Sequence, residues 1–552
     1  MKKLFALLLC LTMVLGLLAA CGGSESANTS NGTNANTTTA PTESGATGES
    51  SAPVGENTNS TSPIPTITAF SVGYAKADIT PHDSVPLRGY GDAMERFSEG
   101  YLEPMYATCV AFADTDGTVV LLISTDLTNS ADSMTKDTRE AISAATGVPF
   151  SNILFTASHS HSAPDYSQGH PNIPNYILMV REQALKGAKE AIANLSPATM
   201  ETGFTRVDNT NTVRHYLLAN GSYQGRAVGT VKKDQLIGHY SKVDNLLQVV
   251  KFTRESDKDV ILVNWAGHPM GVEDSIYKMA GPNYPGILRQ ELEAMYDCNV
   301  SFVLSGSGNV NNGSAIKGEV TQKDYKELGK RLAENVSNVI ETGLTPGKAD
   351  KIQLNENLWQ TPNKYGRINT VPLYAFSVGD WACVAAPFEI FDTNAMAVRD
   401  ASPFKMTFYA SCANESHGYL PTPASYGWTI TYEAQITNYP KGTAELLQEQ
   451  LIGQLETIFA ASGNEIVDKG EGYNTPEFVP SSDGTVYMNP NAGDASAVSA
   501  VQNGFYHIVL FKGTEVKNML CIDKATADKV VAASQMELVL NEQNVIVDVI
   551  AK

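Results

Sequence analysis

Four short segments each place a possible metal ligand directly after an apolar run of residues. ASHSHSAPD carries His159 and His161, and NWAGHPM carries His268. AAPFEIF carries Glu389, and NESHGYLPT carries Tyr419. Two neutral imidazoles and a carboxylate can hold Zn²⁺ and leave a coordination position for water. If the apolar strand continues through ASHSHSAPD, the spacing of two also places His159 and His161 on one face.

Each of these residues has an ordinary structural explanation when it is taken alone. A single histidine is more often a surface group or a satisfied core group than a ligand, and the chain has only nine histidines. Glu389 alone is more often a plain carboxylate, and Tyr419 alone is more often a packing residue. The spacing alone therefore leaves two interpretations open, a metal site at the three histidines or unrelated structural roles.

The elements that would position these residues alternate between apolar and amphipathic stretches. Apolar runs at 119–127 and 152–158 flank an amphipathic stretch at 135–147, which predicts a strand, a helix and a parallel strand. Further strands are predicted at 259–267, 300–306, 374–387 and 404–411, and helices at 176–194, 286–295, 323–340 and 444–460. Sites in such folds form at the carboxyl ends of strands. The predicted fold class is α/β, a mixed β-sheet core flanked by helices.

Changes in composition along the chain predict four parts. Residues 66–462 form the main domain, which carries the four segments, and residues 463–552 form a small C-terminal β-containing module. Within the module, ELVLNEQNVIVDVI predicts two strands around a polar turn. Residues 22–65 contain neither Lys nor Arg and are rich in Ser, Thr, Asn and Gly, which predicts a disordered tether. Residues 1–21 have the pattern of a signal peptide.

The first residues predict a lipoprotein. Two lysines precede an apolar run at 4–18 that is too short to cross a bilayer comfortably. LAAC (18–21) resembles a lipobox, in which the Cys becomes the lipid-bearing N-terminus. An ordinary signal peptide with an incidental Cys is the alternative. We expect Cys21 to anchor the protein to the outer face of a bacterial cell membrane.

Net charge and cysteine usage argue against several other classes of protein. The 39 Lys and Arg against 59 Asp and Glu give a net charge of −20, which argues against nucleic acid as a partner and against electrostatic docking on anionic lipid. The N-terminal anchor is then the only expected contact with the membrane. The cysteines after Cys21 are odd in number and scattered, without a CxxC pair, which argues against disulfides and thiolate metal sites. The sequence leaves the oligomeric state open.

The main domain carries an ordered series of motifs: VGYAKADITP (72–81), PLRGYG (86–91), LISTDL (122–127), SHSHSAP (158–164), NTVRH (211–215), GHP (267–269), PNYPG (282–286), GSGNVNNG (306–313), PFEIF (387–391) and NESHGYLPTPASYGWTITYE (414–433). Taken in order, these motifs resemble those of the neutral/alkaline (non-lysosomal) ceramidases, which are zinc-dependent amide hydrolases. The resemblance covers residues 67–460, nearly all of the folded part. SHSHSAP is moderately specific, and the ordered series is much more so.

The resemblance implies one zinc ion per chain, held by His159, His268, Glu389 and Tyr419. Zinc at such a site lowers the pKa of a water molecule towards neutrality and polarises an amide carbonyl. Tyr419 would then shift between the metal and the oxyanion as charge develops. The expected partner is a lipid or another N-acyl small molecule.

Three other residues are implied to act on the substrate. His161 matches a second active-site histidine, placed to pass a proton to the leaving amine. Arg214 matches an arginine that contacts the substrate or the intermediate, and Tyr432 matches a tyrosine near the reacting carbonyl. Both would stabilise the oxyanion of the tetrahedral intermediate.

One motif departs from the family pattern. The ceramidases carry Gly-Asp-Val-Ser-Pro-Asn, whose Ser sits at the reacting centre, whereas this chain has Gly308-Asn309-Val310-Asn311-Asn312. Asn309 replaces the Asp, and Asn311 replaces the Ser. Because an amide is neither a nucleophile nor an acid, any role for a serine alkoxide is lost, while activation of water by the metal survives.

Three functions follow from these observations. The first is hydrolysis of an amide by metal-activated water, as in the conversion of an N-acylsphingosine to a fatty acid and a sphingoid base. The second is zinc-dependent hydrolysis of another amide or of an ester. The third is a non-catalytic lipoprotein that binds a ligand in a retired site. Intact metal ligands favour the first two functions, and Asn311 keeps the third open.

Overall fold

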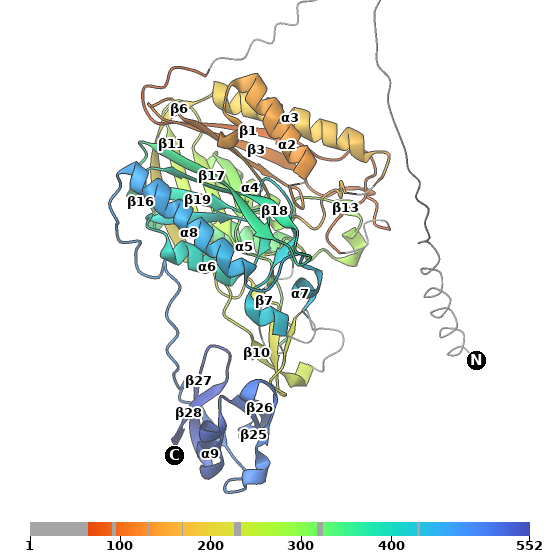
Figure 1. Ribbon diagram of the computed structural model, residues 1–552, viewed down its shortest axis with the longest axis vertical. Coiled ribbons are helices and arrows are strands. Elements are labelled where there is room, and N and C mark those ends of the chain that lie inside the picture. Colours follow the sequence, from red (N-terminus) through yellow and green to blue (C-terminus); the bar gives the residue numbers. More distant parts are fainter. Residues whose placement is uncertain are drawn as a thin grey trace, which may run out of the picture. The chain divides into compact units, whose positions relative to one another are not determined.

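Two β-sheets that pack face to face form the core of the chain (Figure 1). The computed structural model describes residues 64–90, 95–130, 132–167, 169–225, 233–316, 319, 324–427 and 431–552. The larger sheet has the strand order β14-β12-β11-β6-β1-β3-β4-β5, and β16 pairs with β6. Its strands are β1 (Ser71–Asp78), β3 (Tyr106–Ala113), β4 (Val119–Thr125), β5 (Ile153–Ala157), β6 (Ser196–Arg206), β11 (Leu246–Arg254), β12 (Val260–Trp265), β14 (Asn299–Leu304) and β16 (Thr345–Gly347).

The smaller sheet has the order β17-β18-β19-β21 and closes the other side of this core. Its strands are β17 (Ile352–Pro362), β18 (Ile368–Val378), β19 (Trp381–Ala385) and β21 (Met406–Ala410). Aromatic rings fill the space between the sheets, and Phe112 of β3 lies 5.8 Å from both Phe376 of β18 and Trp381 of β19, between ring centroids. A fully buried side chain of this size stabilises the fold by about 1.5–3 kcal/mol. This packing holds the strand ends of the two sheets together.

Helices cover the outer face of each sheet, so the main domain has four layers (Figure 1). The larger sheet is covered by α2 (Asp132–Thr146), α3 (Ile173–Ala193), α4 (Asn283–Tyr296) and α5 (Tyr325–Thr342). The smaller sheet is covered by α6 (Asp392–Ala401) and α8 (Thr443–Ser462). Both sheets mix parallel and antiparallel pairs. The predicted α/β class, with a mixed sheet core flanked by helices, is confirmed.

Several pairs and one small sheet of short strands lie outside the two main sheets. β7 (Thr212–Val213) pairs with β15 (Val310–Asn311), and β20 (Glu389–Ile390) pairs in parallel with β22 (Tyr419–Leu420). β8 (His215–Leu218), β9 (Tyr223–Gly225) and β10 (Leu236–His239) form a small sheet, and β2 (Gly100–Tyr101) pairs with β13 (Met279–Ala280). The five-residue helix α7 (Tyr432–Ile436) follows them in the chain.

The predicted elements of the main domain are present, with one correction. The expected strand-helix-strand unit is β4, α2 and β5, and β4 and β5 are parallel. The segment 374–387, predicted as a single strand, instead turns between β18 and β19 at Gly379, whose φ is 53°. A Cβ at Gly379 would lie 1.7 Å from the Lys348 carbonyl oxygen, so the sharp turn requires a glycine.

The C-terminal module is a six-stranded sheet packed on one helix. Its strands are β23 (Val486–Met488), β24 (Ser499–Ala500), β25 (Tyr506–Lys512), β26 (Glu515–Cys521), β27 (Gln535–Leu540) and β28 (Ile546–Ala551), and its helix is α9 (Lys524–Ala532). The two strands predicted in ELVLNEQNVIVDVI are the antiparallel pair β27 and β28. Leu520 and Val545 of the module are buried against Leu217 of β8.

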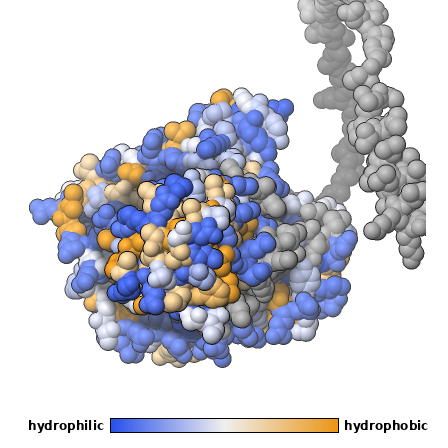
Figure 2. Space-filling view, turned by 90° about the horizontal axis from the view of Figure 1, so that it is seen from below, coloured by the Kyte–Doolittle hydropathy of each residue, from blue (hydrophilic) through white to orange (hydrophobic). Residues whose placement is uncertain are grey.

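The helices of the described residues were compared with the length and apolarity that a bilayer requires. None of them is both long enough and apolar enough to cross a bilayer. Figure 2 shows hydrophobic residues interspersed with hydrophilic ones on one face of the molecule. The predicted signal peptide, Cys21 and the tether up to residue 63 lie outside the described residues.

Candidate metal centre

The carboxyl ends of parallel strands from both sheets meet at one place. β5 ends at Ala157 and leads into His159 and His161, and β12 ends at Trp265 and leads into His268. Glu389 follows β19 of the other sheet and lies directly opposite Tyr419 in the β20–β22 pair. The Asn414 backbone N–H donates to the Phe155 carbonyl at 2.7 Å, which connects the segment after β21 to β5. The structure thus brings all five sequence-predicted residues together.

His159 and His161 do not lie on one face of a continuing strand, which was the arrangement expected if the strand extended through ASHSHSAPD. The strand does not continue through them, because His159 has a left-handed backbone with φ of 67°. Its amide N–H donates to the Leu127 carbonyl at 2.9 Å, which holds the chain in a turn. Such a conformation costs a non-glycine residue about 1–3 kcal/mol and is typical of functional sites. The two imidazoles therefore meet through a strained turn, with their Nε2 atoms 3.4 Å apart.

Hydrogen bonds to backbone carbonyls define which nitrogen of each ring faces the centre. His159 Nδ1 lies 2.5 Å from the Thr128 carbonyl, and His268 Nδ1 lies 2.7 Å from the Ser307 carbonyl. A carbonyl oxygen only accepts, so each Nδ1 carries the proton and each neutral ring presents a bare Nε2. This arrangement fixes the tautomer in the way that metal-binding histidines require.

The Glu389 carboxylate and the Nε2 atoms of His159 and His268 face one another. Glu389 Oε2 lies 3.2 Å from His159 Nε2 and 3.6 Å from His268 Nε2. His268 Nε2 and Glu389 Oε2 are buried and have no hydrogen-bond partner among the described residues. A positive charge stabilises this group, either a proton on His159 Nε2, which the Glu389 carboxylate favours, or a cation between the three atoms. The donor set, two imidazole nitrogens and a carboxylate oxygen, fits Zn²⁺.

The cluster offers two overlapping sets of ligands. His159, His161 and His268 are buried, and one ligand atom of each lies within 4.8 Å of the others. His159 and His268 with Glu389 form the other set, to which the Tyr419 hydroxyl is adjacent. His159 and His268 belong to both sets, so the choice lies between His161 and Glu389.

Burial and neighbouring charges shift the pKa of each titratable group in the cluster. Burial lowers the pKa of His268 to about 4, and burial with the two neighbouring histidines holds the pKa of His161 well below its usual range. Burial also lowers the pKa of His159, but the Glu389 carboxylate outweighs it and raises that pKa well above its usual value. Neutral His161 and His268 are in the form that can bind a metal or accept a proton.

An ion-pair cluster next to Tyr419 holds Arg214. The Arg214 Nε donates to Glu433 Oε1 at 2.7 Å, and its Nη2 donates to the Gly308 carbonyl at 2.7 Å and to the Tyr419 hydroxyl at 3.3 Å. Glu433 Oε2 also lies 3.0 Å from His215 Nε2, and the Glu433 side chain is fully buried. Glu433 and His215 were missed in the sequence, although both lie in quoted motifs next to predicted residues. The available signal was the position of Glu433 directly after Tyr432, which the resemblance places near the reacting carbonyl.

Tyr432 lies at the edge of the cluster. Its ring is 5.7 Å from the Tyr419 ring in an edge-to-face arrangement, and the residue is 38% exposed. It begins helix α7, which also carries Glu433. Arg214 and Tyr432, predicted to act together, therefore both contact Tyr419.

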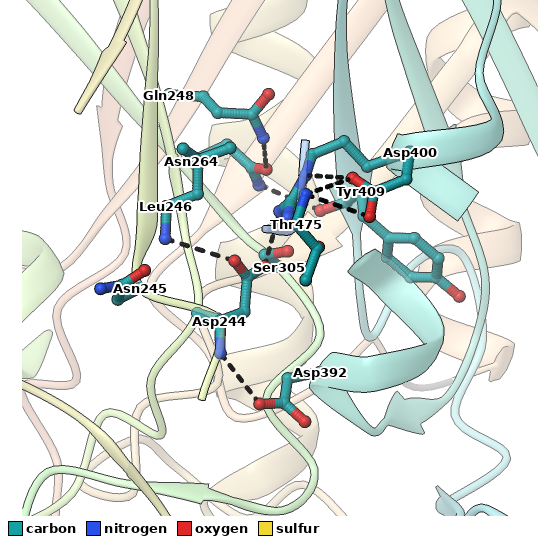
Figure 3. Close-up of polar contacts among 12 residues, drawn as sticks. Asp244, Asn245, Leu246, Gln248, Asn264, Ser305, Asp392, Asp400, Tyr409 and Thr475 are labelled. Atoms are coloured by element: carbon teal, nitrogen blue, oxygen red, sulfur yellow. Dashed lines mark hydrogen bonds and ion pairs between the residues drawn. The ribbon is translucent and has the colours of Figure 1, made fainter. Parts of the chain in front are cut away.

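A buried polar network behind the cluster fixes the loop that carries Asn309. The Asn309 amide donates to Asp392 Oδ1 at 2.7 Å, and the Asp392 N–H donates back to Asn309 Oδ1 at 2.9 Å. Asp392 also accepts the Asp244 N–H at 3.0 Å, a contact drawn in Figure 3. The Asn309 carbonyl in turn accepts the Arg214 N–H at 2.8 Å. Asn309 thus has a structural role that positions Arg214.

Two glycines permit close approaches that a side chain would block. A Cβ at Gly308 would lie 2.4 Å from the Glu389 carbonyl oxygen. A Cβ at Gly89, whose φ is 125°, would lie 2.5 Å from the Cβ of His161. Because glycine has no side chain, the backbone at both positions can lie directly against a residue of the cluster.

A pocket of about 350 Å³ adjoins the cluster. Its wall includes Tyr90, whose ring lies 5.4 Å from the His161 ring in an edge-to-face arrangement. Asn312, also in the wall, donates from Nδ2 to the His268 carbonyl at 2.8 Å. Asn311, which stands where the related motif has Ser, lines the same pocket.

Comparison with known proteins gives a match in three-dimensional structure. No model of a known protein family matches the chain, and no curated protein matches its sequence. The crystal structure of neutral ceramidase from Pseudomonas aeruginosa superposes with a TM-score of 0.58 and 13% identity, covering 82% of this chain and 92% of that one. The chain has a neutral ceramidase-like fold. A ceramidase structure described as complexed with C2 matches with the same TM-score, identity and coverage.

Proposed function

We propose that the protein is a zinc-dependent hydrolase that cleaves the amide bond of an N-acyl lipid, as a neutral ceramidase does. The observation that carries this proposal is the convergence of His159 Nε2, His268 Nε2 and Glu389 Oε2, a donor set that a bound zinc ion would bridge. The neutral ceramidase-like fold supports the proposal independently, since the resemblance in motifs and the likeness in structure point to the same family of enzymes.

His159, His268 and Glu389 would hold the zinc ion, with the Tyr419 hydroxyl as a fourth ligand. Bound zinc supplies a Lewis acid that polarises a carbonyl and makes water a nucleophile near neutral pH. The Tyr419 hydroxyl accepts a hydrogen bond from Arg214 at 3.3 Å. Glu433 and the Gly308 carbonyl fix the Arg214 guanidinium, which in turn orients the phenol towards the cluster.

The remaining residues of the site would move a proton and stabilise charge. His161 is buried and held neutral, so its imidazole can accept a proton and pass it to the leaving amine. Arg214 is fixed by Glu433 and by the Gly308 carbonyl, which presents its guanidinium to charge that develops near Tyr419. Tyr432 would donate from the exposed edge of the same space.

The proposal is tested by zinc content and hydrolysis measured on the same preparations. Wild-type protein should contain one zinc per chain and release fatty acid from an N-acyl sphingoid panel. His268→Ala should lose most of its zinc and its activity, because it removes a ligand common to both sets. His507→Ala, in the C-terminal module, is the matched control and should keep both. Full zinc in His268→Ala would exclude His268 as a ligand, and zinc without hydrolysis in the wild type would favour a ligand-binding role.

We also propose that the enzyme works outside the cytoplasm, anchored through a lipid on Cys21. This proposal rests on the LAAC motif and the tether composition of residues 22–65. A flexible tether of that length has a root-mean-square reach of about 35 Å, which would let the site meet lipids of the same membrane.

A further inference from the structure

We infer that Asp392 is a positioning residue for the reaction, and that it acts through Asn309 to hold the Arg214 guanidinium beside Tyr419. This inference rests on the proposed function, because that function assigns Arg214 to charge that develops on the substrate. It gives a role to the Asn that stands in place of the motif's Asp. It also adds a residue that lies just outside the PFEIF motif (387–391).

Asp392 is a fully buried carboxylate that N–H groups hold instead of a cation. Asn309 Nδ2 at 2.7 Å and the Thr393 N–H at 2.8 Å donate to its Oδ1, and the Asp244 N–H at 3.0 Å donates to its Oδ2 (Figure 3). None of the described Lys, Arg and His side chains forms an ion pair with it, and Arg399 pairs with Asp244 instead. Burial and the Asp244 charge raise the pKa of Asp392 to about 6, so the carboxylate is charged at pH 8. Hydrogen bonds to a charged acceptor are about twice as strong as neutral ones.

The contact between Asn309 and Asp392 is reciprocal and requires an amide on one side. Asn309 Oδ1 accepts the Asp392 N–H at 2.9 Å, so the Asn309 Nδ2 is the end that faces the carboxylate. Asn309 is only 1% exposed, so water does not compete for these groups. An Asp at position 309 would place two carboxyls in contact, and two carboxyls at that distance cannot both be charged. An Asn at this position therefore matches the charged Asp392 of this chain.

The loop that Asp392 holds contacts Arg214 at two carbonyls. The Asn309 carbonyl accepts the Arg214 backbone N–H at 2.8 Å, and the Gly308 carbonyl accepts from Arg214 Nη2 at 2.7 Å. The same Nη2 donates to the Tyr419 hydroxyl at 3.3 Å. A shift of the loop would therefore move both the backbone and the guanidinium of Arg214. A misplacement of about 1 Å in an active site can lower the rate about a hundredfold.

A double-mutant cycle tests whether Asp392 acts through Asn309. Hydrolysis of N-octanoylsphingosine at pH 8, with zinc supplied, is measured for wild type, Asn309→Ala, Asp392→Ala and the double variant. Each single change should lower kcat about a hundredfold with a smaller change in KM, because Arg214 acts on charge that develops in the transition state. The double variant should be no slower than either single variant, since residues that act as a unit have non-additive effects. Unchanged kcat in either single variant, or losses that multiply in the double variant, would overturn the inference.

Controls separate positioning of Arg214 from loss of metal or of stability. Zinc content should equal that of the wild type in every variant, and loss of zinc would place the pair in the metal site instead. Asp114→Ala is the matched control, because Asp114 is a buried carboxylate that accepts three backbone N–H bonds. It lies between β3 and β4, at the strand ends away from the cluster, so its kcat should not change, and a loss equal to that of Asp392→Ala would contradict the inference. If Asp392→Ala does not fold, Asp392→Asn replaces it in the cycle, and its smaller loss should also vanish when Asn309 is Ala.

Crystal structures of the wild type and of both single variants give a readout that does not require hydrolysis. Arg214 Nη2 should move away from the Gly308 carbonyl in both variants. This shared displacement without hydrolysis by the wild type would refute the hydrolase and leave the role of Asp392 standing. Hydrolysis by the wild type, with Arg214 in place and kcat unchanged in the variants, would refute the role of Asp392 and leave the hydrolase standing.

Discussion

Replacing Glu433 with Gln removes one negative charge from the ion-pair cluster and keeps the shape of the side chain. Burial alone would raise the pKa of Glu433, but Arg214 and His215 outweigh it and lower that pKa from 4.5 to about 2. A difference of this size corresponds to about 3 kcal/mol of stabilisation by the charge. The Glu433 side chain is fully buried and that of Arg214 is 6% exposed, so solvent screens this pair little.

The sign of the pH dependence follows from the lowered pKa. The stabilisation is fully present above the pKa of the unfolded chain, near 4.5, and is lost as the pH falls towards 2. Between pH 6 and pH 3.5 the unfolded carboxyl becomes protonated while the folded one stays charged, which removes about 1.4 kcal/mol. The wild type should lose this amount relative to Glu433→Gln, which does not titrate.

Urea unfolding of metal-free wild type and variant at both pH values measures this difference. At pH 6 the variant should be less stable by about 3 kcal/mol, and at pH 3.5 the gap should narrow by about 1.4 kcal/mol. With zinc supplied, kcat should fall about a hundredfold with a smaller change in KM, because Arg214 is no longer held against the developing charge. Glu103→Gln, a buried carboxylate that accepts from the Tyr325 hydroxyl at 3.1 Å, should keep its activity. A stability gap that is independent of pH, together with unchanged kcat, would refute the role assigned to Glu433.

Three further predictions concern single residues. Asn311→Ala should lower hydrolysis of an N-acyl sphingoid panel by about ten- to a hundredfold, far less than loss of a zinc ligand; activity found only in Asn311→Ser would instead show that the serine is indispensable. Gly89→Ala should lower kcat while zinc content stays normal, because its Cβ would meet the His161 Cβ at 2.5 Å; wild-type kcat in that variant would contradict this. Cys21→Ser should move the protein out of the membrane fraction or block its maturation, and an unchanged membrane fraction would exclude the lipid anchor.

The local pattern of the sequence predicted elements that the structure contains, but it did not predict β1, β3, β6 and β11 of the larger sheet or the arrangement of the strands in two sheets. Apolar runs such as 259–267 and 300–306 correspond to the buried parallel strands β12 and β14, where a continuous apolar run is the expected signal. Strand β17 was missed because it is long and amphipathic, and its residues are mostly half-buried or exposed. The pairing of the sheets depends on contacts such as Phe112 with Trp381, which are far apart in the chain.

The site shows the same division between local and distant information. The places of the candidate ligands after apolar runs were readable in the sequence, but their spacing left their roles open, and only the resemblance of the ordered motifs implied a ligand set. The left-handed turn at His159 was not readable, because it is imposed by hydrogen bonds to Leu127 and Thr128 on another loop. Glu433 was also missed, since its pairing with Arg214 joins residues 219 positions apart.

Anomalous scattering at the zinc edge would show whether zinc binds at His159, His268 and Glu389. A crystal of the zinc-loaded protein should show one anomalous peak, at about 2.0–2.2 Å from His159 Nε2, His268 Nε2 and a Glu389 carboxylate oxygen. We expect His161 to stay outside this set of ligands and to remain able to accept and release a proton. A peak held by the three histidines without Glu389 would contradict the assigned roles of His161 and Glu389, and no peak at the cluster would contradict the metal site itself.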